Sequence, residues 1–255
     1  MVPVPAAEPL QALIFDVDGT LADTERDGHR IAFNEAFRQA GLDWHWDIPL
    51  YGALLAVTGG KERIRYFLQQ FHPQLLDDAD LDSRIAALHQ SKTRCYLDLV
   101  ASGGLPMRPG VARLIAEARD AGLRLAIATT TTPENVVVLL ESSLAKGSTA
   151  WFEVIGAGDI VPAKKPAPDI YTWVLEQLGL PASACLAFED SDNGLRAALG
   201  AGLITLVTTN DYTLDHVFDG ATAVLPDLGS SDSPQCVTLA GLRQWHAAAQ
   251  AGSVP

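Results

Sequence analysis

Two aspartates stand directly after a short apolar run near the start of this 255-residue chain. The run at 13–15 reads Leu-Ile-Phe and predicts a β-strand, and Asp16 and Asp18 follow it without a break. Because Cβ directions alternate along an extended chain, residues at i and i+2 share a face. Ligands of open α/β sheets bind beyond the carboxyl ends of the strands, and Gly19 permits a sharp turn there. One aspartate can therefore attack a substrate while the other moves a proton.

Three further groups of polar residues each stand at or just after the end of another predicted strand. One follows a Leu-Ala-Ile-Ala run, one opens a Lys-Pro-Ala-Pro-Asp stretch, and one follows a Leu-Ala-Phe run. These groups are, in order, Thr129 with Thr130, then Lys165, then Glu189 with Asp190. We expect all of them to converge on Asp16 and Asp18 at the carboxyl edge of the sheet.

The residue types match the needs of phosphoryl transfer through a covalent intermediate. A carboxylate can form an aspartyl phosphate, and a metal and fixed donors must neutralise the charge on the phosphoryl oxygens. Thr129 offers a hydroxyl, Thr130 a backbone N–H and Lys165 a positive charge. Four carboxylates at one site would repel one another, and a hard divalent cation with oxygen ligands relieves this repulsion. The sequence therefore predicts Mg²⁺ as the cofactor.

Each group taken alone also has an ordinary structural explanation. A single Asp-x-Asp at a strand end is often a turn, and a Lys-Lys pair is often solvated. Thr132 before Pro133 fits a helix N-cap, whereas Thr131 with Glu134 fits a capping box. Thr131 therefore stays open between capping and phosphate binding. The conjunction of four groups in one order favours a phosphoryl-transfer site.

The strands that position these groups alternate with helices from the second strand onward. Short apolar runs predict the strands, and apolar residues at i, i+3, i+4 and i+7 predict the helices. This alternation implies an α/β fold, a Rossmann-like parallel sheet with helices on both faces. Strands are predicted at 12–15, 123–128, 152–155, 185–188 and 205–208, and helices at 111–118, 171–178 and 239–246.

The stretch between the first two strands breaks this alternation. Residues 22–103 contain no convincing strand, and about 80 residues far exceed the usual loop length. Their apolar stripes predict three amphipathic helices. We therefore expect an all-helical cap domain at 22–103, inserted into a core of 1–21 and 104–255. The second crossing, at 102–109, carries two glycines and two prolines and is a candidate hinge.

The Asp-x-Asp-Gly-Thr pattern at 16–20, followed by the threonines, the lysine and the acidic pair, resembles the haloacid dehalogenase (HAD) superfamily of aspartate-dependent phosphotransferases. The resemblance covers nearly the whole chain, cap included. It implies that Mg²⁺ is held by Asp16, by the backbone carbonyl of Asp18 and by Asp190. Glu189 would then lie outside this set or bind through water. We predict that Asp16 is the nucleophile, and that Asp18 protonates the leaving oxygen and then activates water.

The position of the helical insert narrows the resemblance to one group of the superfamily. That group contains β-phosphoglucomutase, phosphoglycolate phosphatase and the CbbY-like sugar-bisphosphate phosphatases. Asp-Thr-Glu at 23–25 followed by His29, and Lys-Lys-Pro-Ala-Pro-Asp-Ile-Tyr at 164–171, look most like the CbbY-like proteins. These remove the C1 phosphate of xylulose 1,5-bisphosphate, an inhibitory by-product of carbon fixation.

The resemblance therefore implies a Mg²⁺-dependent phosphatase of a sugar bisphosphate. A sugar phosphomutase and a phosphoglycolate-type phosphatase remain alternatives, because the motifs do not separate them. A role for His29 also stays open, since its spacing is one residue longer than in β-phosphoglucomutase. A catalytically silent sugar-phosphate sensor is disfavoured, because both aspartates, the lysine and the acidic pair are all present.

The cap must contact the rest of the substrate, since the core groups handle one phosphate. The stretch 59–65 concentrates three cations after two glycines, and a helix N-terminus is itself an anion site. In the resembled family this loop faces the active site. We predict that substrate contacts come from Glu25, Gly59, Gly60, Lys61, Arg63 and, at the second crossing, Arg108. Trp44, Trp46 and Tyr51 are expected to pack the cap, although Tyr51 could also bond a sugar hydroxyl.

Charge and cysteine usage limit the partners. Eighteen basic against 31 acidic residues give a net charge of −13, which disfavours nucleic acid and anionic membranes. The three cysteines are widely separated and suit a reducing compartment. No signal-like segment and no apolar run long enough to span a membrane is visible. We expect a cytoplasmic monomer that binds a small phosphorylated sugar.

Overall fold

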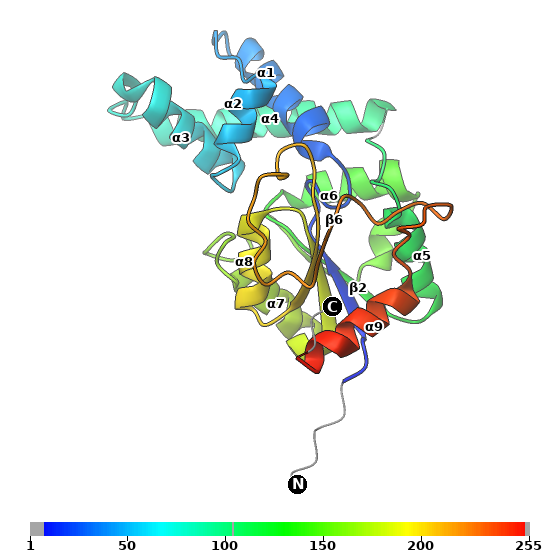
Figure 1. Ribbon diagram of the computed structural model, residues 1–255. Coiled ribbons are helices and arrows are strands. Elements are labelled where there is room, and N and C mark those ends of the chain that lie inside the picture. Colours follow the sequence, from blue (N-terminus) through cyan, green and yellow to red (C-terminus); the bar gives the residue numbers. More distant parts are fainter. Residues whose placement is uncertain (1–7, 104, 253–255) are drawn as a thin grey trace.

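A computed structural model describes residues 8–103 and 105–252 and shows an α/β fold built on a six-stranded parallel sheet (Figure 1). The strand order is β3-β2-β1-β4-β5-β6, so β1 lies at the centre between β2 and β4. The strands are β1 Ala12–Phe15, β2 Arg124–Ala128, β3 Val154–Gly156, β4 Cys185–Glu189, β5 Ile204–Thr208 and β6 Ala223–Leu225. Five of them were predicted; β6 was missed because its apolar run of only three residues, followed by Pro226, is too short to indicate a strand.

Helices cover both faces of this sheet, as the alternation of elements predicted. Leu13 and Phe15 pack with α5, α6 and α9, whereas Ala12 and Ile14 pack with α7 and α8. Side chains that alternate along β1 therefore enter two separate apolar layers, one on each face of the sheet. These helices are α5 Val111–Asp120, α6 Pro133–Leu139, α7 Asp169–Leu178, α8 Asp192–Gly200 and α9 Leu239–Gln250.

Four helices between β1 and β2 lie beyond the carboxyl ends of the strands, at the top of Figure 1. They are α1 Arg30–Gln39, α2 Ile48–Leu54, α3 Gly60–Phe71 and α4 Leu81–Gly103. α2 was not predicted, because its seven residues are too short for a periodic stripe. It is defined by its cap instead, where the Asp47 side chain accepts a bond from the Leu50 N–H.

The helical part has an apolar core of its own. Trp46 is fully buried in it, with its ring centroid 4.7 Å from that of Phe33 and 4.9 Å from that of Phe37. Tyr51 is equally buried, so the expected packing role of these aromatics agrees with the structure. A separate core is what an inserted domain requires. The division at 22 and 103 itself stays a prediction, and Gly104 lies outside the described residues.

Short helical turns complete the described chain. Two are π-helical, Glu25–His29 and Leu140–Leu144, and three are 3₁₀ turns, Pro73–Leu75, Ser148–Trp151 and Ala182–Ala184.

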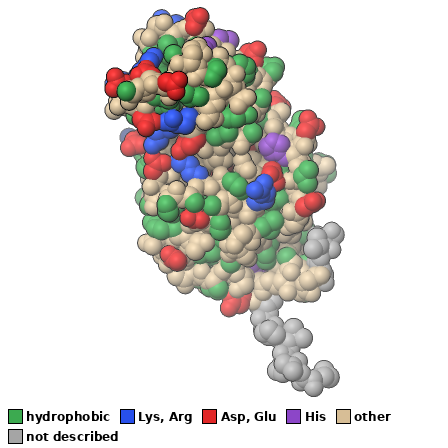
Figure 2. All heavy atoms as spheres, turned by 90° about the vertical axis from the view of Figure 1, so that its left-hand side faces the viewer, with side chains coloured by type: hydrophobic (Ala, Val, Ile, Leu, Met, Phe, Trp, Pro, Cys, Tyr) green, Lys and Arg blue, Asp and Glu red, His purple; other side chains and the backbone are tan. Residues whose placement is uncertain are grey.

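Acidic and basic side chains gather where the helical part meets the sheet part (Figure 2). No helix within 8–103 or 105–252 is long and apolar enough to cross a membrane.

Candidate active site

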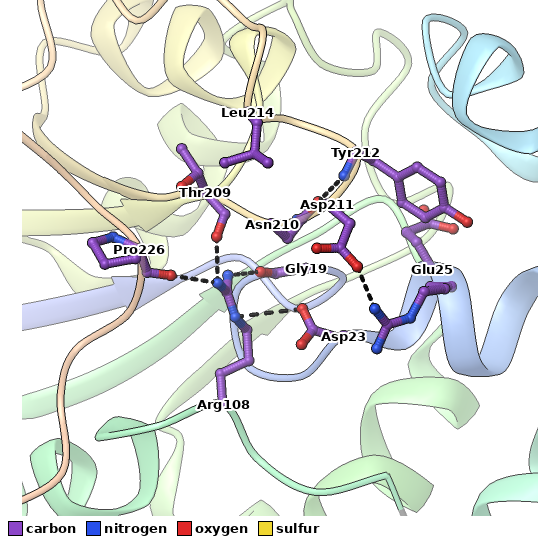
Figure 3. A pocket seen from close by; sticks show the side chains of 11 residues that line it. Gly19, Asp23, Glu25, Arg108, Thr209, Asn210, Asp211, Tyr212, Leu214 and Pro226 are labelled. Carbon is purple, nitrogen blue, oxygen red and sulfur yellow. Dashed lines mark hydrogen bonds and ion pairs between the residues drawn. The ribbon is translucent and has the colours of Figure 1, made fainter. Parts of the chain in front are cut away.

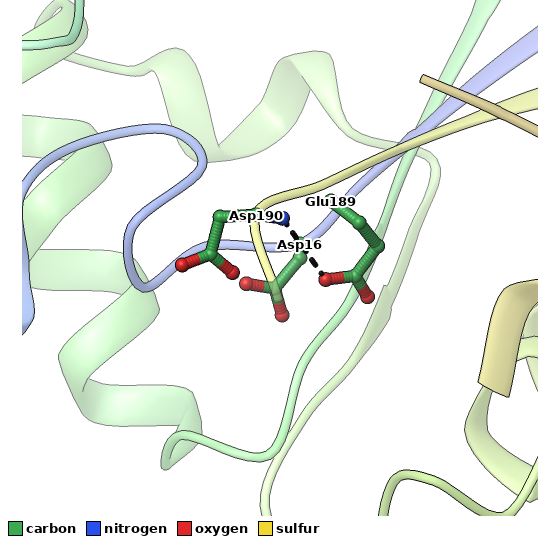
Figure 4. A group of neighbouring side chains, drawn as sticks. All are labelled: Asp16, Glu189 and Asp190. Carbon is green, nitrogen blue, oxygen red and sulfur yellow. Dashed lines mark hydrogen bonds between the residues drawn. The ribbon is translucent and has the colours of Figure 1, made fainter. Parts of the chain in front are cut away.

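Three buried carboxylates meet at the carboxyl ends of the two central strands (Figure 4). Asp16 follows β1, and Glu189 and Asp190 stand at the end of β4. Phe15 pairs with Phe188 across the ladder, so the residues after them emerge side by side. One oxygen atom from each carboxylate lies within 4.8 Å of the others. The sheet register therefore builds the acidic cluster that the sequence predicted.

The cluster is electrostatically unfavourable without a cation. Burial, together with the charges of Glu189 and Asp18, raises the pKa of Asp16 to about 7 despite the opposing effect of Lys165. Burial and the charges of Asp16 and Glu189 also raise the pKa of Asp190 well above its ordinary value. Oxygen ligands of this kind suit a hard divalent cation such as Mg²⁺. The donor set therefore fits the metal that the family implies.

Lys165 holds two of these carboxylates in place. Its Nζ donates to Asp16 Oδ1 at 2.6 Å, to Glu189 Oε1 at 2.7 Å and to the Ala128 carbonyl at 2.9 Å. The Tyr171 hydroxyl donates to the same Glu189 Oε1. Burial alone would lower the pKa of Lys165, but the two carboxylates raise it, so the side chain stays charged. Glu189 therefore pairs with Lys165 in this structure, and its place outside the set of metal ligands stays a prediction.

Asp18 lies in a separate hydrogen-bond network. Its Oδ1 accepts bonds from Thr24 Oγ1 at 2.6 Å and from His29 Nε2 at 2.9 Å. On the other side of the ring, Lys92 Nζ lies 2.8 Å from His29 Nδ1. Burial opposes ionisation of Asp18, yet His29 and the Thr24 hydroxyl hold its pKa below the ordinary value.

The sequence interpretation missed Lys92 and Tyr171. Lys92 lies on α4, on the stripe that contains Ile85, Leu88 and Cys95, and it is buried. A lysine on an apolar helix face was a usable signal, because an isolated buried ammonium is costly. Tyr171 was interpreted as part of the apolar face of α7. In the structure its hydroxyl also donates a hydrogen bond to Glu189.

The threonines after β2 divide between two roles. Thr129 and Thr130 line the cavity above the acidic cluster. Thr132 is the N-cap of α6, where its hydroxyl accepts from the Asn135 N–H. The Thr131 hydroxyl accepts from the Asn135 side chain instead, and Thr131 does not line the cavity. Its assignment to phosphate binding therefore finds no support in the geometry.

A cavity of about 340 Å³ lies between the acidic cluster and the cap. Glu25 and Arg63 lie on its cap side. Arg63 is buried, its Nη1 donates to the Tyr51 hydroxyl at 2.9 Å, and that hydroxyl donates to Glu25. Arg63 Nη1 also lies 3.7 Å from Glu25 Oε2. Tyr51 therefore has a polar role in addition to its packing role.

The other predicted cap contacts do not line this cavity. Lys61 Nζ pairs with Asp159 at 2.8 Å on the outer surface, and Lys164 pairs with the same carboxylate at 2.7 Å. Gly59 takes a left-handed φ of 98° at the start of α3, and Gly60 follows it. The two glycines shape the turn that delivers Arg63 to the cavity. The structure thus separates Arg63 from Lys61, which the sequence had grouped together.

Arg108 is bonded mainly to backbone carbonyls and does not line the cavity above the acidic cluster. Its guanidinium donates to the carbonyl of Thr208 at 3.0 Å. It also donates to the carbonyls of Pro226 at 2.7 Å, Gly19 and Thr209, and its Nε lies 3.4 Å from Asp23 Oδ1 (Figure 3). It borders a neighbouring cavity of about 260 Å³, but its donors are already engaged by the backbone. Arg108 therefore fastens the loops after β5 and β6 to the first motif, and its contact with a substrate stays a prediction.

Comparison with known proteins identifies the family of this chain. A model of the haloacid dehalogenase-like hydrolase family matches residues 10–202. The chain is 51% identical to the plasmid-encoded protein CbbY of Cupriavidus necator over 247 residues, which cover 93% of this chain and 97% of that protein. It is 50% identical to CbbY of Rhodobacter capsulatus over 87% of this chain and 95% of the relative.

Two solved structures extend the likeness to three dimensions. A mutant of CbbY from Rhodobacter sphaeroides in complex with xylulose 1,5-bisphosphate is 46% identical, with a TM-score of 0.82, covering 91% of this chain and 99% of that one. A β-phosphoglucomutase from Clostridium difficile, 19% identical with a TM-score of 0.72, covers 93% of this chain and 97% of that one and shares the fold alone. The chain therefore belongs to the haloacid dehalogenase-like hydrolases, as a close homologue of CbbY.

Proposed function

We propose that this protein is a Mg²⁺-dependent phosphatase that removes one phosphate from a sugar bisphosphate, with the C1 phosphate of xylulose 1,5-bisphosphate as the best candidate. One observation carries the proposal: a single cavity has the carboxylate cluster with Lys165 at its core end and Arg63 at its cap end. A substrate with two phosphates matches two cationic positions in one cavity, one from the core and one from the cap. The xylulose 1,5-bisphosphate bound by CbbY of Rhodobacter sphaeroides supports this substrate class.

In the proposed reaction, an Asp16 oxygen attacks the phosphorus and the bond to the sugar oxygen breaks. Asp18 gives its proton to that oxygen, leaving an aspartyl phosphate on Asp16. Water then attacks the phosphorus, Asp18 accepts a proton, and phosphate departs from a regenerated Asp16. Lys165 and the donors of Thr129 and Thr130 hold the phosphoryl oxygens.

Asp18 must carry a proton in the first step, although His29 favours its ionised form. A phosphate dianion in the cavity raises the pKa of a nearby carboxyl, so substrate binding supplies the condition for proton uptake. Mg²⁺ held by Asp16, Asp190 and the Asp18 carbonyl would neutralise charge on the transferred group. Residues 22–103 would act as a cap that excludes water during transfer.

A phosphate-release screen tests this function. The protein with Mg²⁺ is incubated with sugar monophosphates, sugar bisphosphates, phosphoglycolate and β-glucose 1-phosphate, and free phosphate is measured. We expect the highest kcat/KM for a pentulose 1,5-bisphosphate. Preference for phosphoglycolate, or conversion of glucose 1-phosphate to glucose 6-phosphate without phosphate release, would contradict the proposal in favour of the respective alternative.

A further inference from the structure

Tyr212, in the loop between β5 and β6, packs against the cap. Its ring centroid lies 6.0 Å from that of Tyr51, with the rings steeply inclined. A Cβ atom added to Gly52 of α2 would lie 3.0 Å from Cδ1 and 3.3 Å from Cε1 of Tyr212. A side chain at position 52 would therefore press against the tyrosine ring, which would have to move by a few tenths of an ångström.

The loop that carries Tyr212 is hydrogen-bonded to the acidic cluster of the core. The Tyr212 N–H donates to Asn210 Oδ1 at 2.9 Å, and Asn210 Nδ2 donates to Asp190 Oδ2 at 2.7 Å. Figure 3 shows Tyr212 projecting from this loop toward Glu25, which lies at the base of the cap. The backbone of Tyr212 is therefore positioned by the carboxylate site, whereas its ring meets α2.

Glycine at position 52 is not required by the backbone. Gly52 lies inside α2 and is absent from the glycines with positive φ. Glycine is among the least favourable residues inside a helix, and alanine is the most favourable. Close approach of the Tyr212 ring is the physical reason that remains for glycine here.

The Tyr212 hydroxyl contributes little to the contact. It is buried and has no hydrogen-bond partner among the described residues. Burial raises its pKa, so it stays protonated and uncharged. The contact with Gly52 is therefore made by ring carbons of Tyr212 and not by a hydrogen bond of its hydroxyl.

We propose that Tyr212 is a positioning residue whose ring, seated on Gly52, sets the closed position of the cap over the acidic cluster. The inference rests on the proposed role of 22–103 as a cap. Moving the cap outward would displace Arg63 from its place opposite Lys165, so the contact bears on two-phosphate substrates more than on small ones.

The test is a double-mutant cycle with Gly52→Ala, Tyr212→Ala and both together, with Tyr212→Phe as the matched control. We expect each alanine variant to lower kcat/KM for xylulose 1,5-bisphosphate about 3- to 10-fold, the ratio that one aromatic contact is worth. The double variant should match Tyr212→Ala, because the added methyl then meets no ring. Tyr212→Phe should keep the original kcat/KM, and Gly52→Ala should not lower the melting temperature.

Additive losses, a Gly52→Ala variant with unchanged kcat/KM, or a Tyr212→Phe variant as impaired as Tyr212→Ala would each overturn the proposal. Hydrogen exchange of residues 48–54 with Mg²⁺ and inorganic phosphate reads the contact without any sugar substrate. Exchange should be faster in Tyr212→Ala than in the unchanged protein and in Tyr212→Phe, and equal exchange in all three would also overturn it. Failure of the unchanged protein to hydrolyse a bisphosphate would instead count against the proposed function.

Discussion

Lys165 Nζ lies 2.6 Å from Oδ1 of Asp16, a residue 149 positions earlier in the chain. The bond fixes one oxygen of the predicted nucleophile, and Asp16 lines the cavity. The same ammonium bonds Glu189, which in turn accepts from Tyr171. The predicted nucleophile is therefore oriented by a buried chain of charges and hydrogen bonds rather than by its own strand alone.

Replacing Asp16 should remove the covalent route. Asp16→Asn keeps the size of the side chain but offers no carboxylate to form an aspartyl phosphate. We expect no measurable phosphate release and no acid-stable phosphoprotein after mixing with labelled substrate. Substantial steady-state turnover by Asp16→Asn would show that another group attacks phosphorus.

Replacing Lys165 should damage both activity and stability. Lys165→Met leaves Glu189 buried without its cation, and breaking a buried pair typically costs about 3–5 kcal/mol of unfolding free energy. Loss of one fixed donor to the phosphoryl group should lower kcat about 10²–10³-fold. Tyr171→Phe is the matched control, since it leaves the Lys165 ion pair intact, and its kcat should fall less than about tenfold. Denaturant titration and phosphate release measure the two effects.

Replacing Lys92 should affect substrates according to their leaving groups. Lys92 acts on Asp18 through the His29 ring, so Lys92→Met should weaken proton transfer while leaving Asp16 and Lys165 in place. We expect kcat to fall by up to about 10²-fold for a sugar phosphate, the lower end of what acid–base catalysis contributes. Hydrolysis of 4-nitrophenyl phosphate should fall much less, because its leaving group needs no proton. Equal losses on both substrates would argue for a structural role of Lys92.

Arg63 and Lys61 should differ sharply although they lie two residues apart. Arg63 lines the cavity, and a charged hydrogen bond is worth about 1.5–3 kcal/mol, so Arg63→Ala should lower kcat/KM for a pentulose bisphosphate roughly 10–150-fold. Lys61→Ala removes an exposed ion pair with Asp159 and should change kcat/KM less than about threefold. A small aryl phosphate, which has no distal phosphate, is the control substrate for both. A greater loss with Lys61→Ala would place the distal phosphate outside the cavity described above.

Binding of Mg²⁺ should weaken as the pH falls. Metal ligands must be deprotonated, whereas burial and like charges raise the pKa of Asp16 to about 7 and raise that of Asp190 well above its ordinary value. Below pH 7 the ion therefore displaces at least one proton, and the apparent Kd should rise about tenfold per pH unit. Calorimetric titrations at pH 6, 7 and 8, in buffers of different ionisation enthalpy, measure both affinity and proton release. Constant affinity without proton release would contradict the assignment of these carboxylates to the ion.

The raised pKa of Asp16 also makes the stability of the metal-free protein depend on pH. A carboxyl whose pKa is raised in the folded protein binds more protons folded than unfolded between pH 4 and 7. This contribution stabilises the metal-free protein at low pH and is lost as the pH rises through 7. Adding Mg²⁺ at pH 8 should restore stability, because the ion takes over the role of the protons.

The sequence determined the parts of this protein that depend on local pattern. Five strands, the core helices α5, α7 and α9 and the acidic residues at the ends of β1 and β4 followed from apolar runs and turns, which are properties of neighbouring residues. The first motif and its order relative to Lys165 and Asp190 indicated the family before any packing was known. Such local motifs indicate a common site because a parallel sheet gathers the ends of its strands at one edge.

Only the tertiary structure decided which charged side chain meets which partner. Arg63 lines the cavity, whereas Lys61 lies on the outer surface. Arg108 donates to carbonyls of residues about 90 to 120 positions away. Lys92 lies next to His29, which belongs to another helix of the cap. Short elements such as α2 and β6 also escaped notice, since a few residues carry no period. Long side chains find partners through packing of distant segments, and burial then makes each pairing obligatory, because an unpaired buried charge is costly.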